Sequence, residues 1–186
     1  GLYFTPNLNK NKMKKPNIDY VSVLDGIKSI SARNEAFDKL DDQSKRLEIA
    51  WDALKLSKRG IINASNGCYW GSELAVVQFE SNTSKDFQRK LNKTSNFKGC
   101  FVCARGAVML SLIRLGNNIN PDTDYGVENG SEETVRGFSM QSMKHMENEY
   151  ELSTYSHPYS SNTEEKLMNI LCNVLVNGDF NAKDTT

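Results

Sequence analysis

The chain has 186 residues, its 23 Lys and Arg balance 23 Asp and Glu, and 38% of its residues are apolar. This length suffices for one domain with a buried core. The longest apolar stretch, residues 106–113, is far shorter than the roughly 20 residues that a membrane-spanning helix needs. No secretory leader with a charged start and an apolar middle opens the sequence. These features exclude an integral membrane protein and predict a chain without a membrane partner.

The balanced net charge hides a split along the chain. Residues 1–116 hold 19 basic and 11 acidic side chains, a net charge of +8, whereas residues 117–186 hold 4 basic and 12 acidic side chains, a net charge of −8. One interpretation is that the two parts attract each other within a single domain. Two others are that the basic part meets an anionic partner, nucleic acid included, and that basic and acidic faces meet head-to-tail between copies.

Residues 1–17 are predicted to form a basic, flexible tail. Four lysines lie between positions 10 and 15 without an acidic neighbour, and Pro16 follows them. A segment of this kind becomes ordered only against a partner. The candidate partner-binding residues of the sequence are therefore Lys10, Lys12, Lys14 and Lys15. The folded domain is expected at residues 18–180, followed by a short tail at 181–186.

The first half of the domain has helix and turn patterns. Residues 18–30 are predicted to form a short helix. A longer helix is predicted to begin after Asp41 or Asp42, which can cap it, and to end near residue 58, before Gly60. The turn-rich stretch 60–79 predicts a small hairpin, in which 61–62 pairs with 69–70, or an irregular insert; residues 74–79 suit a strand or a helix. The buried stripe of the longer helix is expected to comprise Leu47, Ala50, Trp51 and Leu54.

The second half is predicted to hold the central helix and two more helices. Residues 100–115 are apolar on most sides, which indicates a buried helix. A polar, acidic loop follows at 117–137. Ser139 then caps a helix, and Ser161 with Glu164 forms a capping box that opens the last one. The expected buried stripes of these two helices are Met143, Met146 and Tyr150, and Leu167, Ile170, Leu171, Val174 and Leu175.

Cys100 and Cys103 have the C-x-x-C spacing that zinc sites and redox dithiols share. At the start of a helix, exposed N–H groups lower the pKa of a thiol and favour the thiolate. The spacing has three interpretations: structural free thiols, a metal site with zinc as its cofactor, or a redox pair. A four-ligand zinc site needs further ligands, for which the chain offers Cys68, Cys172, His145 and His157.

Cys68 lies in the glycine-rich stretch N-G-C-Y-W-G, which suggests the nucleophile of a cysteine hydrolase. Such an enzyme needs a His base and an orienting Asn or Asp. Neither His145 nor His157 lies in a hydrolase signature. A half-buried thiol is the alternative, and no catalytic residue is predicted.

The segment C-F-V-C-A-R-G-A at 100–107, followed by an apolar helix, resembles a group of proteins from gut bacteria and their phages. In that group an amphipathic helix leads through a short G-x-Y turn to a C-x-V-C-A-x-G-A segment. The corresponding parts here are residues 46–55, 67–69 and 100–107. The group has no known activity, so the resemblance implies a phage-related source and no particular reaction.

The sequence therefore predicts a mainly α-helical single domain with a small hairpin or irregular insert. The predicted function is that of a non-enzymatic accessory protein of a phage or mobile element, which binds another macromolecule as a virion component or as an inhibitor of a host system. The expected partner is a protein or a second copy, with nucleic acid as a further candidate, in the host cytoplasm or the virion. The alternative is a zinc-binding or thiol-redox protein centred on Cys100 and Cys103.

Overall fold

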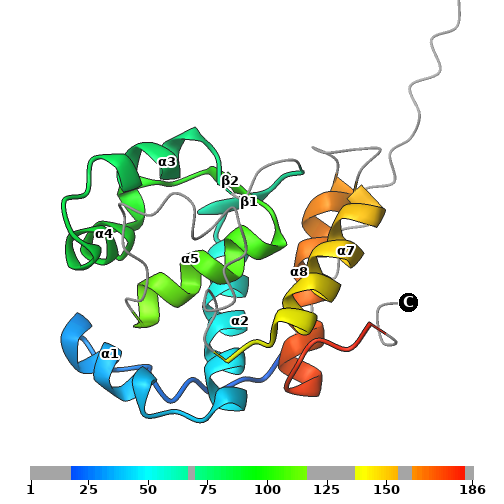
Figure 1. Ribbon diagram of the computed structural model, residues 1–186, viewed down its shortest axis with the longest axis horizontal. Helices are drawn as coiled ribbons and strands as arrows, with labels where there is room; N and C mark the ends of the chain where they lie inside the picture. The colour runs from blue at the N-terminus through cyan, green and yellow to red at the C-terminus, as the bar shows by residue number, and fades with distance from the viewer. Residues whose placement is uncertain (1–17, 67–69, 117–136, 155–160, 183–186) are drawn as a thin grey trace, which may run out of the picture.

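A computed structural model describes residues 18–66, 70–116, 137–154 and 161–182, and Figure 1 shows their arrangement. This part of the chain is mostly helical, which confirms the predicted fold class, and it contains one two-stranded sheet. The elements in chain order are α1 (Ile30–Asp38), α2 (Asp42–Lys58), β1 (Ile62–Ala64), α3 (Ser72–Phe79), α4 (Ser84–Leu91), η1 (Thr94–Asn96), β2 (Cys100–Val102), α5 (Ala104–Gly116), α7 (Met140–Thr154) and α8 (Ser161–Asn177).

The predicted boundaries of α2 are confirmed. The Asp41 carboxylate accepts a hydrogen bond from the Ser44 N–H (2.7 Å) and so caps the first turn. Gly60, with φ of +67°, follows the last turn. The helix packs against α5 and also against α8, so it buries more than one stripe. Ala50 and Leu54 are buried as predicted, Leu47 and Trp51 are half-buried, and two acids are buried with them: Glu48 and Asp52.

Residues 18–29 are not helical, contrary to the prediction. The reason is a set of hydrogen bonds to the buried Glu48 carboxylate of α2. This carboxylate accepts hydrogen bonds from the Tyr20 hydroxyl (2.9 Å), the Ser22 hydroxyl (2.6 Å) and the Val23 N–H (2.8 Å). Three donors on one short segment hold it along α2, and the first helix begins only at Ile30.

The helix predicted at 100–115 is divided in the structure. Cys100–Val102 forms β2, and the helix α5 begins at Ala104. β2 pairs in parallel with β1, with Ile62 opposite Cys100 and Ala64 opposite Val102. A parallel partner lies far away in the sequence, so the periodicity of residues 100–115 alone does not reveal it.

The predicted hairpin is therefore wrong, because β1 pairs with β2 and not with the residues that follow it. Trp70 forms an isolated antiparallel bridge to Val102, and Tyr69 lies outside the described residues. The next segment, whose sequence suits a strand or a helix, forms the helix α3. Its N-cap is Gly71, whose N–H donates to the Phe101 carbonyl (2.7 Å), so α3 starts on the edge of β2.

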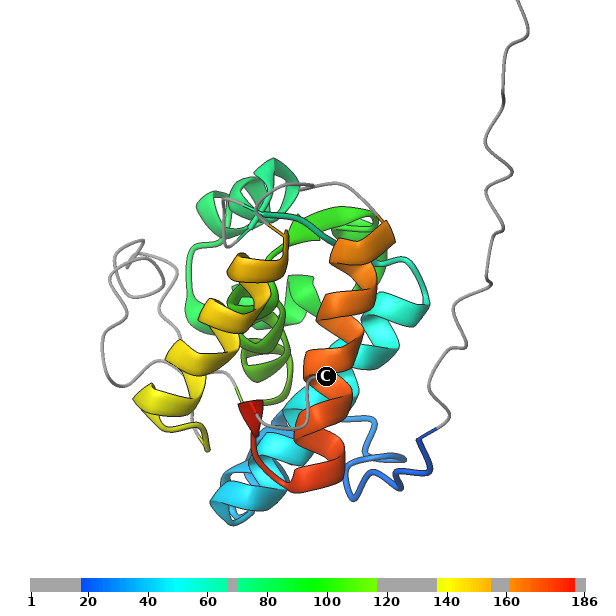
Figure 2. The ribbon, with the colours of Figure 1, turned by 90° about the vertical axis from the view of Figure 1, so that its right-hand side faces the viewer.

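The helix α5 is the central element, as predicted. It packs against α1, α2, α4 and α7, and both views show it surrounded by these helices (Figures 1 and 2). Its residues Val108 to Ile113 are completely buried. Hydrophobic burial on all sides of one helix makes α5 the main contributor to the core.

The helices α7 and α8 pack side by side (Figures 1 and 2). Ser139 caps α7 by accepting a hydrogen bond from the Ser142 N–H (3.0 Å). The predicted stripes of both helices are confirmed: Met143, Met146 and Tyr150 are buried on α7, and Leu167, Ile170, Leu171 and Val174 on α8, with Leu175 packed at the margin. Within the described ranges, the helices are too short or too polar to cross a membrane.

Candidate functional site

The short helix α3 exposes apolar side chains on its outer face. It buries Leu74 and Val77 against the domain, but Val76 is 51% exposed and Phe79 is 91% exposed. Val76 and Phe79 are three residues apart and therefore lie one turn apart on the same side of the helix. An exposed Phe beside an exposed Val is the feature of this surface that core packing does not explain.

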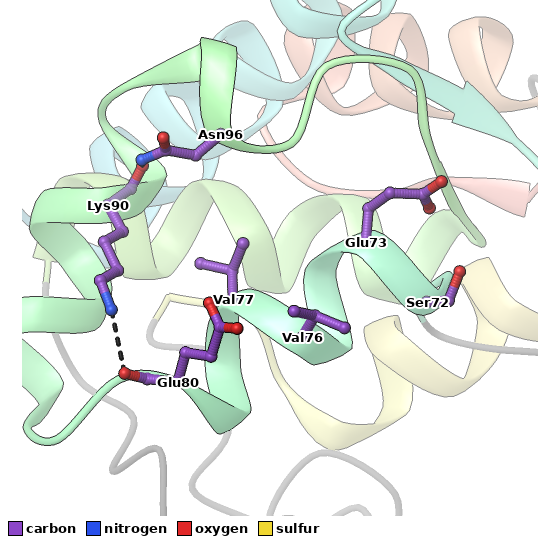
Figure 3. Close-up of a pocket in the computed structure, with 7 residues that line it drawn as sticks. All are labelled: Ser72, Glu73, Val76, Val77, Glu80, Lys90 and Asn96. Carbon is purple, nitrogen blue, oxygen red and sulfur yellow. Dashed lines mark hydrogen bonds between the residues drawn. The ribbon is translucent and has the colours of Figure 1, made fainter.

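A groove of about 440 Å³ runs beside α3 (Figure 3). Residues of α3 form one wall, and Lys90 of α4 and Asn96 of η1 form the other. The opposite wall is fixed by two hydrogen bonds: Lys90 Nζ donates to the Glu80 carbonyl (3.0 Å), and Asn96 Nδ2 donates to the Lys90 carbonyl (3.0 Å). The walls are therefore tied together at one end of the groove.

The groove lining holds two carboxylates, those of Glu73 and Glu80, and one ammonium group, that of Lys90. Lys90 already pairs with Asp86 (3.3 Å), and a hydrogen bond from Arg89 is the main reason why the pKa of the Asp86 carboxyl is lowered. Glu73 and Glu80 line the groove, and within the described ranges neither carboxylate has an ion-pair or hydrogen-bond partner. Glu80 directly follows α3 with a helical backbone conformation, seven residues after Glu73, so the two carboxylates lie on the same side of the helix.

The two cysteines of the C-x-x-C spacing lie in the interior. The Cys100 thiol donates to the Ile61 carbonyl (3.8 Å). Burial above all, and then the negative charge of Glu73, raise the pKa of this thiol from 9.0 to about 12. The prediction that a helix start lowers the thiol pKa is thus wrong for Cys100, because this residue belongs to a buried strand. Cys103 precedes α5, and its sulfur accepts a hydrogen bond from the Gly106 N–H (3.4 Å).

The predicted zinc ligands do not form a metal site within the described residues. Cys100, Cys103 and Cys172 are free thiols, and the part of the chain that the structure describes contains no group of three or more His, Cys, Asp and Glu side chains able to hold a metal ion. His145 lies on the exposed side of α7. A zinc site at Cys100 and Cys103 would therefore need ligands from outside the described residues, where Cys68 and His157 lie.

The candidate partner-binding lysines, Lys10, Lys12, Lys14 and Lys15, lie outside the described residues, as does the acidic loop at 117–136. Two ion pairs nevertheless join the basic and acidic parts of the chain within the domain: Arg46 with Asp179 (3.8 Å) and Arg105 with Glu147 (3.2 Å). Some basic residues of the first part of the chain therefore pair with acidic residues of the second part within the same domain.

Sequence reasoning missed a polar network at the end of α5. The Arg114 carbonyl accepts hydrogen bonds from Arg33 Nη2 (2.8 Å), Gln88 Nε2 (3.2 Å) and Asn92 Nδ2 (3.2 Å). These donors come from α1, α4 and the residue after α4, so the network holds both helices against α5. The acceptor is a backbone carbonyl, which any residue would supply, so the sequence carries no signal for this network.

Comparison of the chain with known protein families, curated proteins and solved structures found no match. No residue role is therefore transferred from a relative. The function has to be argued from the exposed face of α3, the groove beside it and the charges of both.

Proposed function

We propose that this chain is a non-enzymatic protein that binds another protein through the α3 face, defined as Glu73, Val76, Phe79 and Glu80. The observation that carries this proposal is the 91% exposure of Phe79 beside a half-exposed Val76. Covering side chains of this size yields about 1.5–3 kcal/mol each when they are fully buried. Aromatic residues are also enriched in the cores of protein interfaces.

The charges of the α3 face favour a protein over nucleic acid. The carboxylates of Glu73 and Glu80 form no ion pair in the described part of the chain, and carboxylates repel phosphate groups. A protein segment with basic and apolar side chains matches both the acids and the apolar pair. Nucleic acid stays a candidate only for the lysines at 10–15.

The groove lining favours binding over catalysis. Ser72 is the one hydroxyl among the described residues that line it, and no histidine stands among them. A nucleophile with its base and orienting group is therefore not assembled there. The thiol alternative is less supported, because Cys100 is buried and its pKa is raised.

The accessory role in a phage or mobile element belongs to the same proposal. Its support is the resemblance of the segment at 100–107 to the phage-related group. A virion component and an inhibitor of a host system would both act by occupying another protein. The α3 face supplies a surface for either role.

The proposal is tested by substituting the apolar pair in the full chain. Phe79→Ser and Val76→Ser should leave the melting temperature unchanged, because both side chains face solvent. In a sucrose gradient of native lysate, the wild-type chain should migrate well above its 20.9 kDa mass, and the variants should migrate as monomers. Val176→Ser on α8, where the side chain is 74% exposed, is the matched control and should migrate like the wild type. Equal migration of the wild type and Phe79→Ser would overturn the proposal.

A further inference from the structure

We infer that the occupant of the α3 face is the basic segment of a second copy of this chain. This inference rests on the proposed function and names its partner. The segment comprises residues 10–23, which carry four lysines and then the exposed Val21 and Val23. It supplies cations for the acids of the α3 face and apolar side chains for its apolar pair.

The first argument is charge complementarity. The carboxylates of Glu73 and Glu80 have no ion-pair or hydrogen-bond partner in the described ranges, and two turns of helix separate the two residues by about 10 Å. Lysines at alternate positions, such as 10, 12 and 14, share one side of an extended peptide at intervals of about 7 Å. Two of them can therefore reach the two carboxylates at once.

The second argument is the apolar surface that follows the lysines. Val21 is 86% exposed and Val23 is 62% exposed. The Glu48 carboxylate holds this stretch in place through Ser22 Oγ (2.6 Å) and the Val23 N–H (2.8 Å). Both valines are exposed, and none of the helices and strands that the structure describes covers them. Docking on Val76 and Phe79 would cover four exposed apolar side chains together.

The segment before Ile18 is too short for the lysines to reach the groove of their own copy, which selects a second copy as the partner. The start of the described chain, drawn in blue, and α3 lie at opposite ends of the domain in both views (Figures 1 and 2). A compact domain of about 160 residues has a radius of gyration of about 15 Å and thus a diameter of about 39 Å. Lys15 is three residues from Ile18 and Lys10 is eight, so an extended chain carries them at most about 11 Å and about 29 Å. The lysines of one copy therefore serve the groove of the next, which is a heterologous contact.

The test is sedimentation of the purified, nuclease-treated full chain at about 0.1 M and about 1 M salt, where the Debye length is about 10 Å and about 3 Å. We expect concentration-dependent self-association at low salt that weakens at least tenfold at high salt. Two charge-reversal variants should each abolish it: Glu73→Lys with Glu80→Lys, and a tail variant with Lys→Glu at 10, 12, 14 and 15. The control, Glu35→Lys with Glu165→Lys, makes the same charge change on exposed residues of α1 and α8 and should associate like the wild type.

The most specific test is to mix the two charge-reversal variants and measure their association. The reversed tail of one variant then meets the reversed groove of the other, so heteroassociation should return in the mixture. A monomeric wild type at low salt, association seen only when the nuclease treatment is omitted, or a mixture that stays monomeric would each overturn this inference. A further outcome is that the purified wild type is monomeric, while the wild type in lysate still migrates above its monomer mass in the sucrose gradient and Phe79→Ser does not. In that case the proposed function stands and the partner is a different protein.

Discussion

Arg114 of α5 forms a buried ion pair with Asp52 of α2, with 3.0 Å between Nε and Oδ2. A second contact joins Nη2 and Oδ1 (3.4 Å), and Nη1 donates to the Leu91 carbonyl at the end of α4 (2.6 Å). One guanidinium thus connects three helices in the interior. Because a buried charge is stable only with its partner, neither residue can be removed alone without a large cost.

The ion pair yields a stability prediction. Asp52→Ala should lower the free energy of unfolding by about 3–5 kcal/mol, since it leaves the Arg114 guanidinium buried without its countercharge. Urea denaturation measures this change. Asp25→Ala is the control, because the ion pair of Asp25 with Lys55 (3.9 Å) is exposed and should be worth at most about 1 kcal/mol. Equal losses in the two variants would show that the Asp52–Arg114 pair does not stabilise the core.

The central helix yields a second prediction. Leu112 of α5 is completely buried, so Leu112→Ala should cost about 2–5 kcal/mol, the range for a large-to-small change in a packed core. The exposed Val176 of α8 provides the comparison, and Val176→Ala should stay within about 0.5 kcal/mol of the wild type. A loss below about 1 kcal/mol for Leu112→Ala would mean that α5 is not the core element.

The Cys100 thiol yields a pH prediction. Because its pKa in the folded protein, about 12, exceeds the ordinary value of 9.0, folding favours the protonated thiol. Its contribution to stability is therefore complete below about pH 9 and is lost as the pH rises towards 12. Alkylation followed by mass spectrometry should leave Cys100 unmodified in the native protein at pH 8, because the thiolate is the reactive form. Modification at the rate of an unfolded control would contradict the buried thiol.

The zinc alternative can be separated from a structural role at Cys103. Serine is a good helix cap, so Cys103→Ser should preserve the hydrogen bond from the Gly106 N–H and change stability by less than about 1 kcal/mol. Elemental analysis of the purified wild type should find no stoichiometric zinc. Zinc in the wild type that Cys103→Ser releases, together with a large loss of stability, would establish the metal site and overturn the packing role.

The helices with local signals could be predicted from the sequence. Asp41 and Ser139 cap α2 and α7 as expected, because a cap acts within one helical turn. The buried stripe of α8 follows from its period alone. The pairing of β1 with β2 could not be predicted, because the partner of Cys100 is Ile62, and no local pattern encodes a contact across that separation.

The candidate site was harder to predict than the helices. The run L-A-V-V-Q-F in α3 is almost continuously apolar, so it shows no period that would distinguish its buried side from its exposed side. The exposure of Phe79 depends on how α3 lies against β2 and α4, which is a tertiary property. The lysines at 10–15 were identified from charge alone, and their role depends on the surface that α3 provides.

The most direct test of the central claim is a photo-cross-linking measurement at position 79. The full chain, with a photoreactive phenylalanine analogue in place of Phe79, is irradiated in producing cells, and its adducts are identified by mass spectrometry. The same analogue at position 176, on the exposed side of α8, sets the background. We expect a discrete protein adduct at position 79 that is absent at position 176, with peptides of this chain's own basic segment in it. Equal, diffuse labelling at both positions would contradict the claim that the α3 face binds a protein.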